Sequence, residues 1–317
     1  MPLSDPEFAP APQQRPAPGP LVRLADLMRP RRRLLPLSRL GTGRRTSAEA
    51  MIRDLAGGIP MGDGMLLCRT LGRHKLLVDA ADQAHAPHLL LDGFWEWWTT
   101  AFLARNLRPG ETVVDAGAGY GYFTLLAADL VGPAGRVLAF EPHPRLAALL
   151  RRNVALNGFA DRVEVQQKAV AAAEAPEPLP FLAPAGSPLD GRLAPPPEEE
   201  PGEAAARGGA EAALGVAAMA LDSLAGRGAD LVKLDIPGAE EAAWTGMQRL
   251  LDGRPGLRLL LAYDPARCDS PATLLDAIAA RFPLRRLDPD GRARDCSAAE
   301  LLAGGEAMLF LSRTAPR

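Results

Sequence analysis

Apolar and polar positions change their period from residue 111 onward, and this change predicts the fold. Short apolar runs typical of buried strands are ETVVDAG, RVLAFEP, RVEVQQKAV, DLVKLDI and LRLLLAYD. Stretches with apolar residues at helical spacing separate them: YFTLLAADLV, PRLAALLRRNVALNG, AEEAAWTGMQRLLDG and PATLLDAIAARF. Strands that alternate with helices of this length indicate βαβ units, so we expect an α/β fold with a mostly parallel sheet and helices on both faces.

Two segments depart from this alternation. Near the C-terminus, strands in FPLRRLD and AMLFLSR flank a short helix, SAAELLAG, and we expect the last strand to insert antiparallel at the sheet edge. Residues 171–215 are rich in Ala, Pro, Glu and Gly, which predicts a flexible insertion with a single strand at LPFL. Because the alternation resumes afterwards, this insertion lies within the domain of residues 111–317.

Two further regions precede residue 111. Residues 1–50 are rich in proline and arginine, which predicts a disordered tail with at most a short helix at LVRLADLM. Residues 51–110 predict an N-terminal extension of short strands followed by a helix at FWEWWTTAFLARNL. The arginines between Arg29 and Arg45 leave two interpretations open: a solvated linker, which we favour, and a contact with an anionic surface.

Composition narrows the class of protein. The chain has 317 residues, 47% of them hydrophobic and 23% charged, which is typical of a soluble globular protein. A net charge of −2 gives no reason to expect nucleic acid as the main partner. The three cysteines, Cys68, Cys268 and Cys296, show no disulfide or metal spacing. With no apolar run long enough for a membrane span and no signal peptide, we expect a cytoplasmic protein.

A glycine-rich turn is the main candidate for chemistry. The pattern D-x-G-x-G-x-G runs from Asp115 to Gly121, between a predicted strand and a predicted helix. Glycine serves where the backbone needs a positive φ or where a ligand approaches closely. A dinucleotide fingerprint would be G-x-G-x-x-G, and a carboxylate at its head disfavours a pyrophosphate. A cationic ligand fits better, and Glu141 at the end of the next strand suits ribose hydroxyls. Ribose and cation together indicate S-adenosylmethionine.

Roughly residues 90–290 resemble the FkbM-type S-adenosylmethionine-dependent methyltransferases. The resemblance is carried by GFWEWW, VVDAGAGYGYFTLLAA, VLAFEPHPRLAALLRRNVALNG with its paired Asn153 and Asn157, ALDSL and LVKLDIPGAEEAAWTGM. It implies a Rossmann-like class I methyltransferase fold with seven strands, S-adenosylmethionine as cofactor, and O-methylation of a hydroxyl on a small molecule or glycan. The expected cofactor-binding residues are Asp115, Gly117, Ala118, Gly119, Tyr120, Gly121, Glu141, Pro142, His143 and Glu96.

The chain departs from the family at two acidic positions. The family usually has Glu where this chain has Pro237, and an acid near the end of the following strand, where this chain has Leu261, Ala262 and Tyr263. Two alternatives therefore remain beside the methyltransferase: a non-catalytic S-adenosylmethionine-binding protein and an NAD-dependent oxidoreductase.

Lys233 and Asp235 are the expected catalytic residues. Period two places both on one face of the strand DLVKLDI, near the carboxyl end where ligands of such sheets bind. We expect Asp235 to be the base or the group that orients the acceptor; the alternative is a structural ion pair. Glu240 is interpreted as a helix-start residue. Further candidates are Asp264 and the histidines His74, His85, His88 and His143. Trp95 and Trp98 are expected to share a core face; the alternative is that an aromatic side chain of this stretch forms a wall of the acceptor site. No metal site is predicted.

Overall fold

The computed structural model of the protein describes residues 34–42, 44–184, 186–194 and 211–316. From Leu35 onward the chain forms one compact unit. Most of the predicted N-terminal tail, its short helix LVRLADLM and residues 29–33 of the arginine-rich segment lie outside the described residues, as do residues 195–210 of the insertion. No helix within the described ranges is both long enough and apolar enough to cross a membrane.

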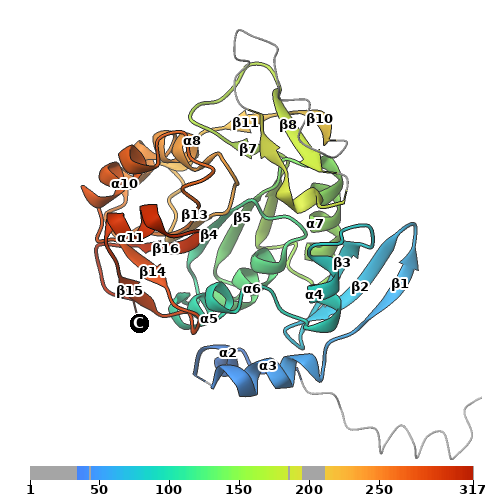
Figure 1. Cartoon of the computed structure of the whole chain (residues 1–317). Helices are drawn as coiled ribbons and strands as arrows, with labels where there is room; N and C mark the ends of the chain where they lie inside the picture. The colour runs from blue at the N-terminus through green and yellow to red at the C-terminus, as the bar shows by residue number, and fades with distance from the viewer. Residues whose placement is uncertain (1–33, 43, 185, 195–210, 317) are drawn as a thin grey trace, which may run out of the picture. The chain divides into compact units, whose positions relative to one another are not determined.

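A sheet of eight strands in the order β15-β14-β16-β13-β12-β4-β5-β6 forms the centre of this unit (Figure 1). Its parallel strands are β4 (Thr112–Ala116), β5 (Arg136–Phe140), β6 (Val163–Gln166), β12 (Leu231–Leu234) and β13 (Arg258–Tyr263). The remaining strands are β14 (Arg285–Leu287), β15 (Ala293–Asp295) and β16 (Ala307–Leu311). The predicted Rossmann-like fold is confirmed, with β15 as an additional short strand.

The last strand, β16, does not lie at the sheet edge as expected. It is antiparallel, but it pairs with β13 on one side and β14 on the other. Residues 308–311 are buried, which suits a strand covered on both faces and paired on both sides. The short strands β14 and β15 form the outer hairpin instead.

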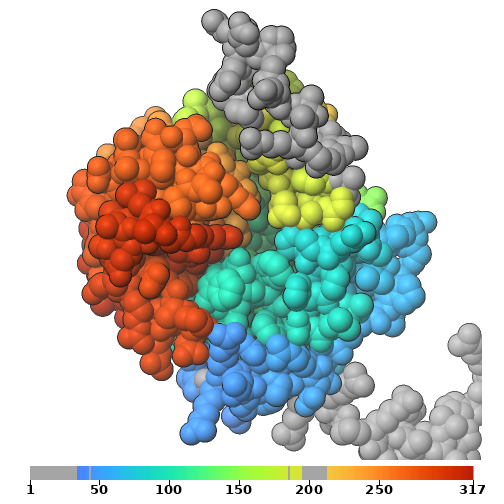
Figure 2. Space-filling view, viewed as in Figure 1, coloured from blue at the N-terminus to red at the C-terminus, as the bar shows by residue number. Residues whose placement is uncertain are grey.

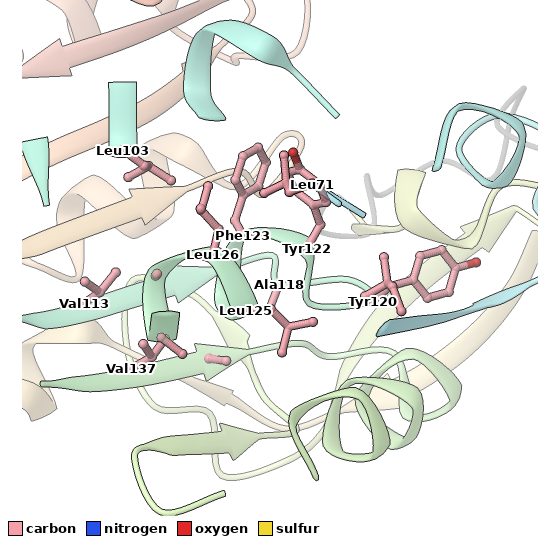
Figure 3. Packing of buried hydrophobic residues seen from close by; sticks show 14 of the residues in the cluster. Leu71, Leu103, Val113, Ala118, Tyr120, Tyr122, Phe123, Leu125, Leu126 and Val137 are labelled. Carbon is pink, nitrogen blue, oxygen red and sulfur yellow. The ribbon is translucent and has the colours of Figure 1, made fainter. Parts of the chain in front are cut away.

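Helices cover both faces of the sheet, and neighbouring strand residues point to opposite layers. Val113 packs in the layer of α5 (Trp97–Asn106), α6 (Tyr122–Val131) and α7 (Pro144–Leu156), part of which Figure 3 shows. Val114 packs in the other layer, which holds α8 (Glu240–Thr245), α9 (Gln248–Gly253), α10 (Pro271–Ala279) and α11 (Ala298–Ala303). This alternation is the period of two expected for a strand buried on both faces.

The N-terminal extension is part of the same core. It comprises α2 (Ser38–Thr42), α3 (Arg45–Arg53), the antiparallel strands β1 (Gly58–Gly62), β2 (Met65–Thr70) and β3 (His74–Asp79), and α4 (Ala86–Leu91). The predicted disordered tail of residues 1–50 was therefore too long. Leu35 and Leu40 are buried in the same hydrophobic cluster as the sheet domain, and α2 packs against α5, so the ordered chain begins earlier than the composition suggested.

The paired asparagines fasten the extension to α7. The Asn153 side chain accepts the Leu77 N–H and donates to the Leu77 carbonyl, over 2.7 and 2.9 Å. One turn later, Asn157 makes the same pair of bonds to Lys75. Each amide thus pairs with the exposed backbone edge of β3 as a further strand would. Asn153 also donates to the Tyr120 carbonyl over 2.8 Å, which ties the glycine-rich turn to this clamp.

The insertion contains more ordered structure than the single predicted strand. β8 (Leu179–Pro184) pairs antiparallel with β10 (Glu211–Val216) and with β9 (Arg192–Leu193). A short helical turn, η1 (Pro188–Asp190), lies between β8 and β9. The short strands β7 (Ala169–Val170) and β11 (Ala218–Met219) pair with each other where the insertion joins the sheet domain.

Candidate functional site

A cavity of about 1180 Å³ lies at the carboxyl ends of the parallel strands, the position at which open α/β sheets bind ligands. In Figure 2 the molecule is hollowed between the orange and red C-terminal segments and the yellow and cyan segments. Residues from the turn after β4, the end of β5, the end of β12 and the turn η1 line it. Of the expected cofactor residues, seven line this cavity: Glu96, Gly117, Ala118, Gly119, Tyr120, Glu141 and Pro142.

All three glycines of the turn have a left-handed backbone, with φ of +77° at Gly117, +53° at Gly119 and +95° at Gly121. A side chain at Gly117 would collide with the carbonyl oxygen of Asp235, and one at Gly121 with Leu150. These two glycines are therefore required by the packing of the chain itself. At Gly117 the close neighbour in the side-chain direction is the residue that follows the next strand of the sheet, although Gly117 also lines the cavity.

Glu141 is held by two backbone donors. The Gly119 N–H donates to Oε2 and the His143 N–H donates to Oε1, each over 2.8 Å. The side chain is 4% exposed and lines the cavity. Burial raises its pKa to about 7, although the two N–H donors act in the opposite direction. Each carboxylate oxygen can accept a second hydrogen bond, so the group can still receive hydroxyl donors.

Asp115 lies behind the cavity wall. Its Oδ2 accepts a 2.6 Å bond from the Thr124 hydroxyl, whereas Oδ1 is buried without a hydrogen-bond partner. The nearest cation is the Lys233 ammonium, 3.9 Å from Oδ1. Burial raises the pKa of Asp115, and the charge of Lys233 opposes this.

Lys233 is surrounded by carboxylates at the cavity floor. Its ammonium lies 2.7 Å from Asp235 Oδ2 and 4.7 Å from the centre of the Phe123 ring. Burial lowers the pKa of Lys233, but the charges of Asp235, Asp115 and Glu96 outweigh this and raise it. One cation thus faces three acids. We call Asp115, Asp235 and Glu96 the acidic cluster; its excess of negative charge suits a cationic ligand.

Glu96 has an unusual backbone and an unusual side-chain environment. It adopts φ +37°, which is rare for a residue with a side chain and is found mainly at functional sites. Its Oε2 accepts a 2.9 Å bond from the Thr99 hydroxyl. Burial and the charge of Asp235 raise its pKa to about 7. The turn at Glu96 therefore holds a buried carboxyl with a raised pKa at the cavity wall.

Several expected residues have other roles. His143 caps α7: its Nδ1 accepts the N–H groups of Arg145 and Leu146, and its ring is not part of the cavity wall. Glu240 begins α8, as expected, and is buried. Asp264 lies outside the wall, with Oδ2 3.2 Å from Arg267.

The tryptophans are arranged differently from the prediction. Trp97 is the core residue, whereas Trp95 and Trp98 line the cavity. Within the described ranges, no three His, Cys, Asp or Glu side chains gather as they would around a metal ion.

The sequence named His85 and Tyr120 as candidates, but it did not show that Asp82 joins them. His85 lines the cavity and its Nδ1 lies 3.1 Å from Asp82 Oδ1, while the Tyr120 hydroxyl donates to Asp82 Oδ2 over 3.0 Å. The i, i+3 spacing of Asp82 and His85 could have suggested the pair. The sequence offered no link to Tyr120, which lies on another element.

Comparisons with known proteins agree with this geometry. Residues 115–261 match the family described as the methyltransferase FkbM domain. Among curated relatives, a protein-L-isoaspartate O-methyltransferase of Aeropyrum pernix is 50% identical over 58 residues, which is 18% of this chain and 22% of the relative. A demethylmenaquinone methyltransferase of Symbiobacterium thermophilum is 35% identical over 75 residues, 23% of this chain and 30% of the relative. The chain thus matches less than a third of the length of these relatives.

The solved structures are less similar to this chain in sequence than these curated relatives are. Aeropyrum pernix fibrillarin, solved with natively bound S-adenosyl-L-methionine, aligns over 81% of this chain and 97% of that one, with 12% identity and a TM-score of 0.39. The family match covers the glycine-rich turn, Glu141, Lys233 and Asp235. Residues 115–261 are therefore an S-adenosylmethionine-dependent methyltransferase domain of the FkbM family.

Proposed function

We propose that the protein binds S-adenosylmethionine in this cavity and transfers its methyl group to a hydroxyl of a small molecule or glycan. The observation that carries the proposal is the pair of 2.8 Å bonds from the Gly119 and His143 N–H groups to Glu141. They fix a buried carboxylate at the end of β5, where a nucleoside's ribose binds in folds of this kind.

The residues present fit the cofactor. Glu141 would accept the two ribose hydroxyls with the lone pairs that its backbone donors leave unused. Ala118, Tyr120 and Pro142 would bound the adenosine part. Asp235 and Glu96, the two members of the acidic cluster on the cavity wall, would face the cofactor's positive charges. When bound, the cofactor supplies an activated methyl group.

Lys233 and Asp235 would act on the acceptor. The 2.7 Å ion pair fixes the Asp235 carboxylate at the cavity floor, where it would accept a hydrogen bond from the acceptor and orient it. Pro237 and Ala262 also line the cavity. The two positions at which the family usually carries acids thus have apolar side chains on this wall. The acceptor would therefore meet fewer carboxylates in this protein than in a typical member of the family.

The size of the cavity suits a site that holds a cofactor and an acceptor together. The cavity of about 1180 Å³ exceeds the ~300–1,000 Å³ of ordinary small-molecule sites. Trp95, Trp98 and Leu189 on its wall offer apolar faces for the flat side of a sugar ring or a similar skeleton.

The test has two steps on the full chain. Calorimetry with S-adenosylmethionine and, separately, with NADH should show binding of the first and none of the second. Methyl-labelled S-adenosylmethionine is then incubated with the protein and a small-molecule extract of a strain lacking it. Mass spectrometry should find a labelled product one methylene heavier than its precursor. Cofactor binding without any labelled product would favour a non-catalytic binding protein, and NADH binding alone would favour an oxidoreductase.

A further inference from the structure

His85 is held in one orientation on the cavity wall. Its Nδ1 lies 3.1 Å from Asp82 Oδ1, and its ring packs against Trp95 with 4.9 Å between ring centres. The opposite nitrogen, Nε2, lies 4.0 Å from Asp190 Oδ1, which is too far for a hydrogen bond. The ring therefore turns one nitrogen to Asp82 and leaves the other available to a ligand.

Asp82 is built to remain ionised. It is fully buried, and its Oδ1 accepts the backbone N–H groups of Ala84 and His85 as well as the ring contact. Its Oδ2 accepts the Tyr120 hydroxyl over 3.0 Å. Burial raises the pKa of Asp82, but these bonds outweigh it and the pKa is lowered. An ionised carboxylate at Nδ1 fixes the tautomer that carries its proton there, so that neutral His85 presents a basic Nε2.

The charges that face His85 come from three elements. They are Asp82 from its own loop, Asp190 from η1 and Asp235 after β12. Burial lowers the pKa of His85, but these carboxylates outweigh it and raise the pKa. Asp235 is less suited to proton removal because its carboxylate is ion-paired with Lys233. A general base works best when its pKa lies near the working pH, which an imidazole satisfies.

We propose that His85 is the general base that takes the proton from the acceptor hydroxyl, with Asp82 and Tyr120 as its positioning residues. This inference rests on the proposed function, since it needs a hydroxyl acceptor in the cavity. As the acceptor oxygen bonds to the methyl carbon, the methyl–sulfur bond breaks and its electron pair stays on sulfur. The hydroxyl proton moves to His85 Nε2, and Asp82 stabilises the imidazolium until the proton leaves to solvent.

Nuclear magnetic resonance on the full chain tests the pairing of His85 with Asp82, which we call the dyad, without any need for turnover. With nitrogen-labelled histidine, the chain gives signals from only four rings. The His85 ring should carry its neutral-state proton on Nδ1 and titrate above its usual pKa, and Asp82→Asn should lower that pKa. A proton on Nε2, or a pKa that does not change in Asp82→Asn, overturns the proposal whether or not the protein methylates anything.

Turnover tests the role of the dyad. With the extract as acceptor pool, His85→Gln should reduce product formation by about 10²–10⁴-fold while the affinity for S-adenosylmethionine stays within twofold. Tyr120→Phe should shift the pH–rate profile and reduce kcat more than it raises KM. His88→Gln is the matched control, because His88 is 58% exposed on the next helix and lies outside the cavity wall.

The outcomes separate this inference from the proposed function. His85→Gln that keeps more than half of the wild-type rate overturns the base assignment and leaves methyl transfer intact. A wild-type chain that binds S-adenosylmethionine but methylates nothing in the extract overturns both. A wild-type chain that does not bind S-adenosylmethionine contradicts the proposed function. The titration of His85 by nuclear magnetic resonance still decides whether the dyad exists.

Discussion

The backbone N–H of Gly119 donates to Glu141 Oε2 across the gap between the turn after β4 and the end of β5. The bond makes two elements of the cavity wall depend on each other: the glycine-rich turn positions the acid, and the acid fixes the turn. Gly119 differs from Gly117 in its side-chain direction, which meets the Leu189 side chain of η1 and no backbone atom.

Gly117 should be essential for folding as well as for binding. Gly117→Ala places a Cβ against the Asp235 carbonyl, so the turn and β12 must separate; we expect a loss of about 3 kcal/mol or more in the free energy of unfolding. Gly132→Ala is the control, since Gly132 also has a positive φ but nothing lies near its side-chain direction, and should cost about 1 kcal/mol. Urea denaturation measures both. Equal losses would show that backbone strain alone explains the glycine.

Asn153 should contribute far more stability than Asn157. Asn153→Leu leaves the Leu77 N–H and two buried carbonyl groups without partners, which should cost roughly 2–5 kcal/mol. Asn157→Leu removes similar bonds at a partly exposed position, where water can replace them, and should cost about 1 kcal/mol. The comparison is made by chemical denaturation. A larger loss at Asn157 would contradict the clamp as described.

The cofactor-free protein should lose stability as the pH rises from about 5 to 7.5. Burial raises the pKa of Glu141 and of Glu240 to about 7, above the usual value of 4.5. A carboxyl group whose pKa is higher in the folded state stabilises the fold below pH 4.5, and this contribution is lost as the pH passes through 7. Thermal unfolding across this range should show a falling Tm, with a smaller fall in Glu141→Gln. Identical curves for the two proteins would contradict the raised pKa of Glu141.

Removing the Lys233 charge should destabilise the protein, because the neighbouring carboxylates lose the cation that balances their charge. Lys233→Met leaves Asp115 and Asp235 buried or half-buried without their cation, and we expect a loss of about 3–5 kcal/mol. Adding Asp235→Asn should recover part of this loss, because the two residues act as a pair. Denaturation of the single and double variants gives the coupling. Strict additivity would mean that the ion pair contributes nothing to folding.

The sequence predicted the order of strands and helices because buried strands and amphipathic helices have distinct periods. The role of Glu141 in binding the ribose stays a prediction; the structure places this side chain on the cavity wall, directly after the end of a strand. The sequence could not show that Asp115 lies behind the cavity wall or that the side-chain direction of Gly117 meets the Asp235 carbonyl, because the packing of the chain itself sets both. A motif cannot show whether a glycine faces a ligand or the next strand.

The position of β16 and the His85 site were beyond sequence reasoning for another reason. The insertion of β16 between β13 and β14 depends on a pairing between segments distant in sequence. The contact of Tyr120 with Asp82 likewise joins the glycine-rich turn to the N-terminal extension. Local periodicity carries no information on such contacts. The composition of residues 34–50 misled for a related reason, because α2 and α3 gain their order from packing on the core.

Calorimetric titration of S-adenosylmethionine into the wild type and Glu141→Ala tests the central claim most directly. Losing a charge-assisted contact to the ribose should cost about 1.5–3 kcal/mol, so the variant should bind at least tenfold more weakly. Glu164→Ala is the control. Glu164 is an exposed acid on β6 that pairs with Arg227, and its variant should bind the cofactor as the wild type does. Affinity unchanged in Glu141→Ala, with the protein folded, would contradict the account of the site.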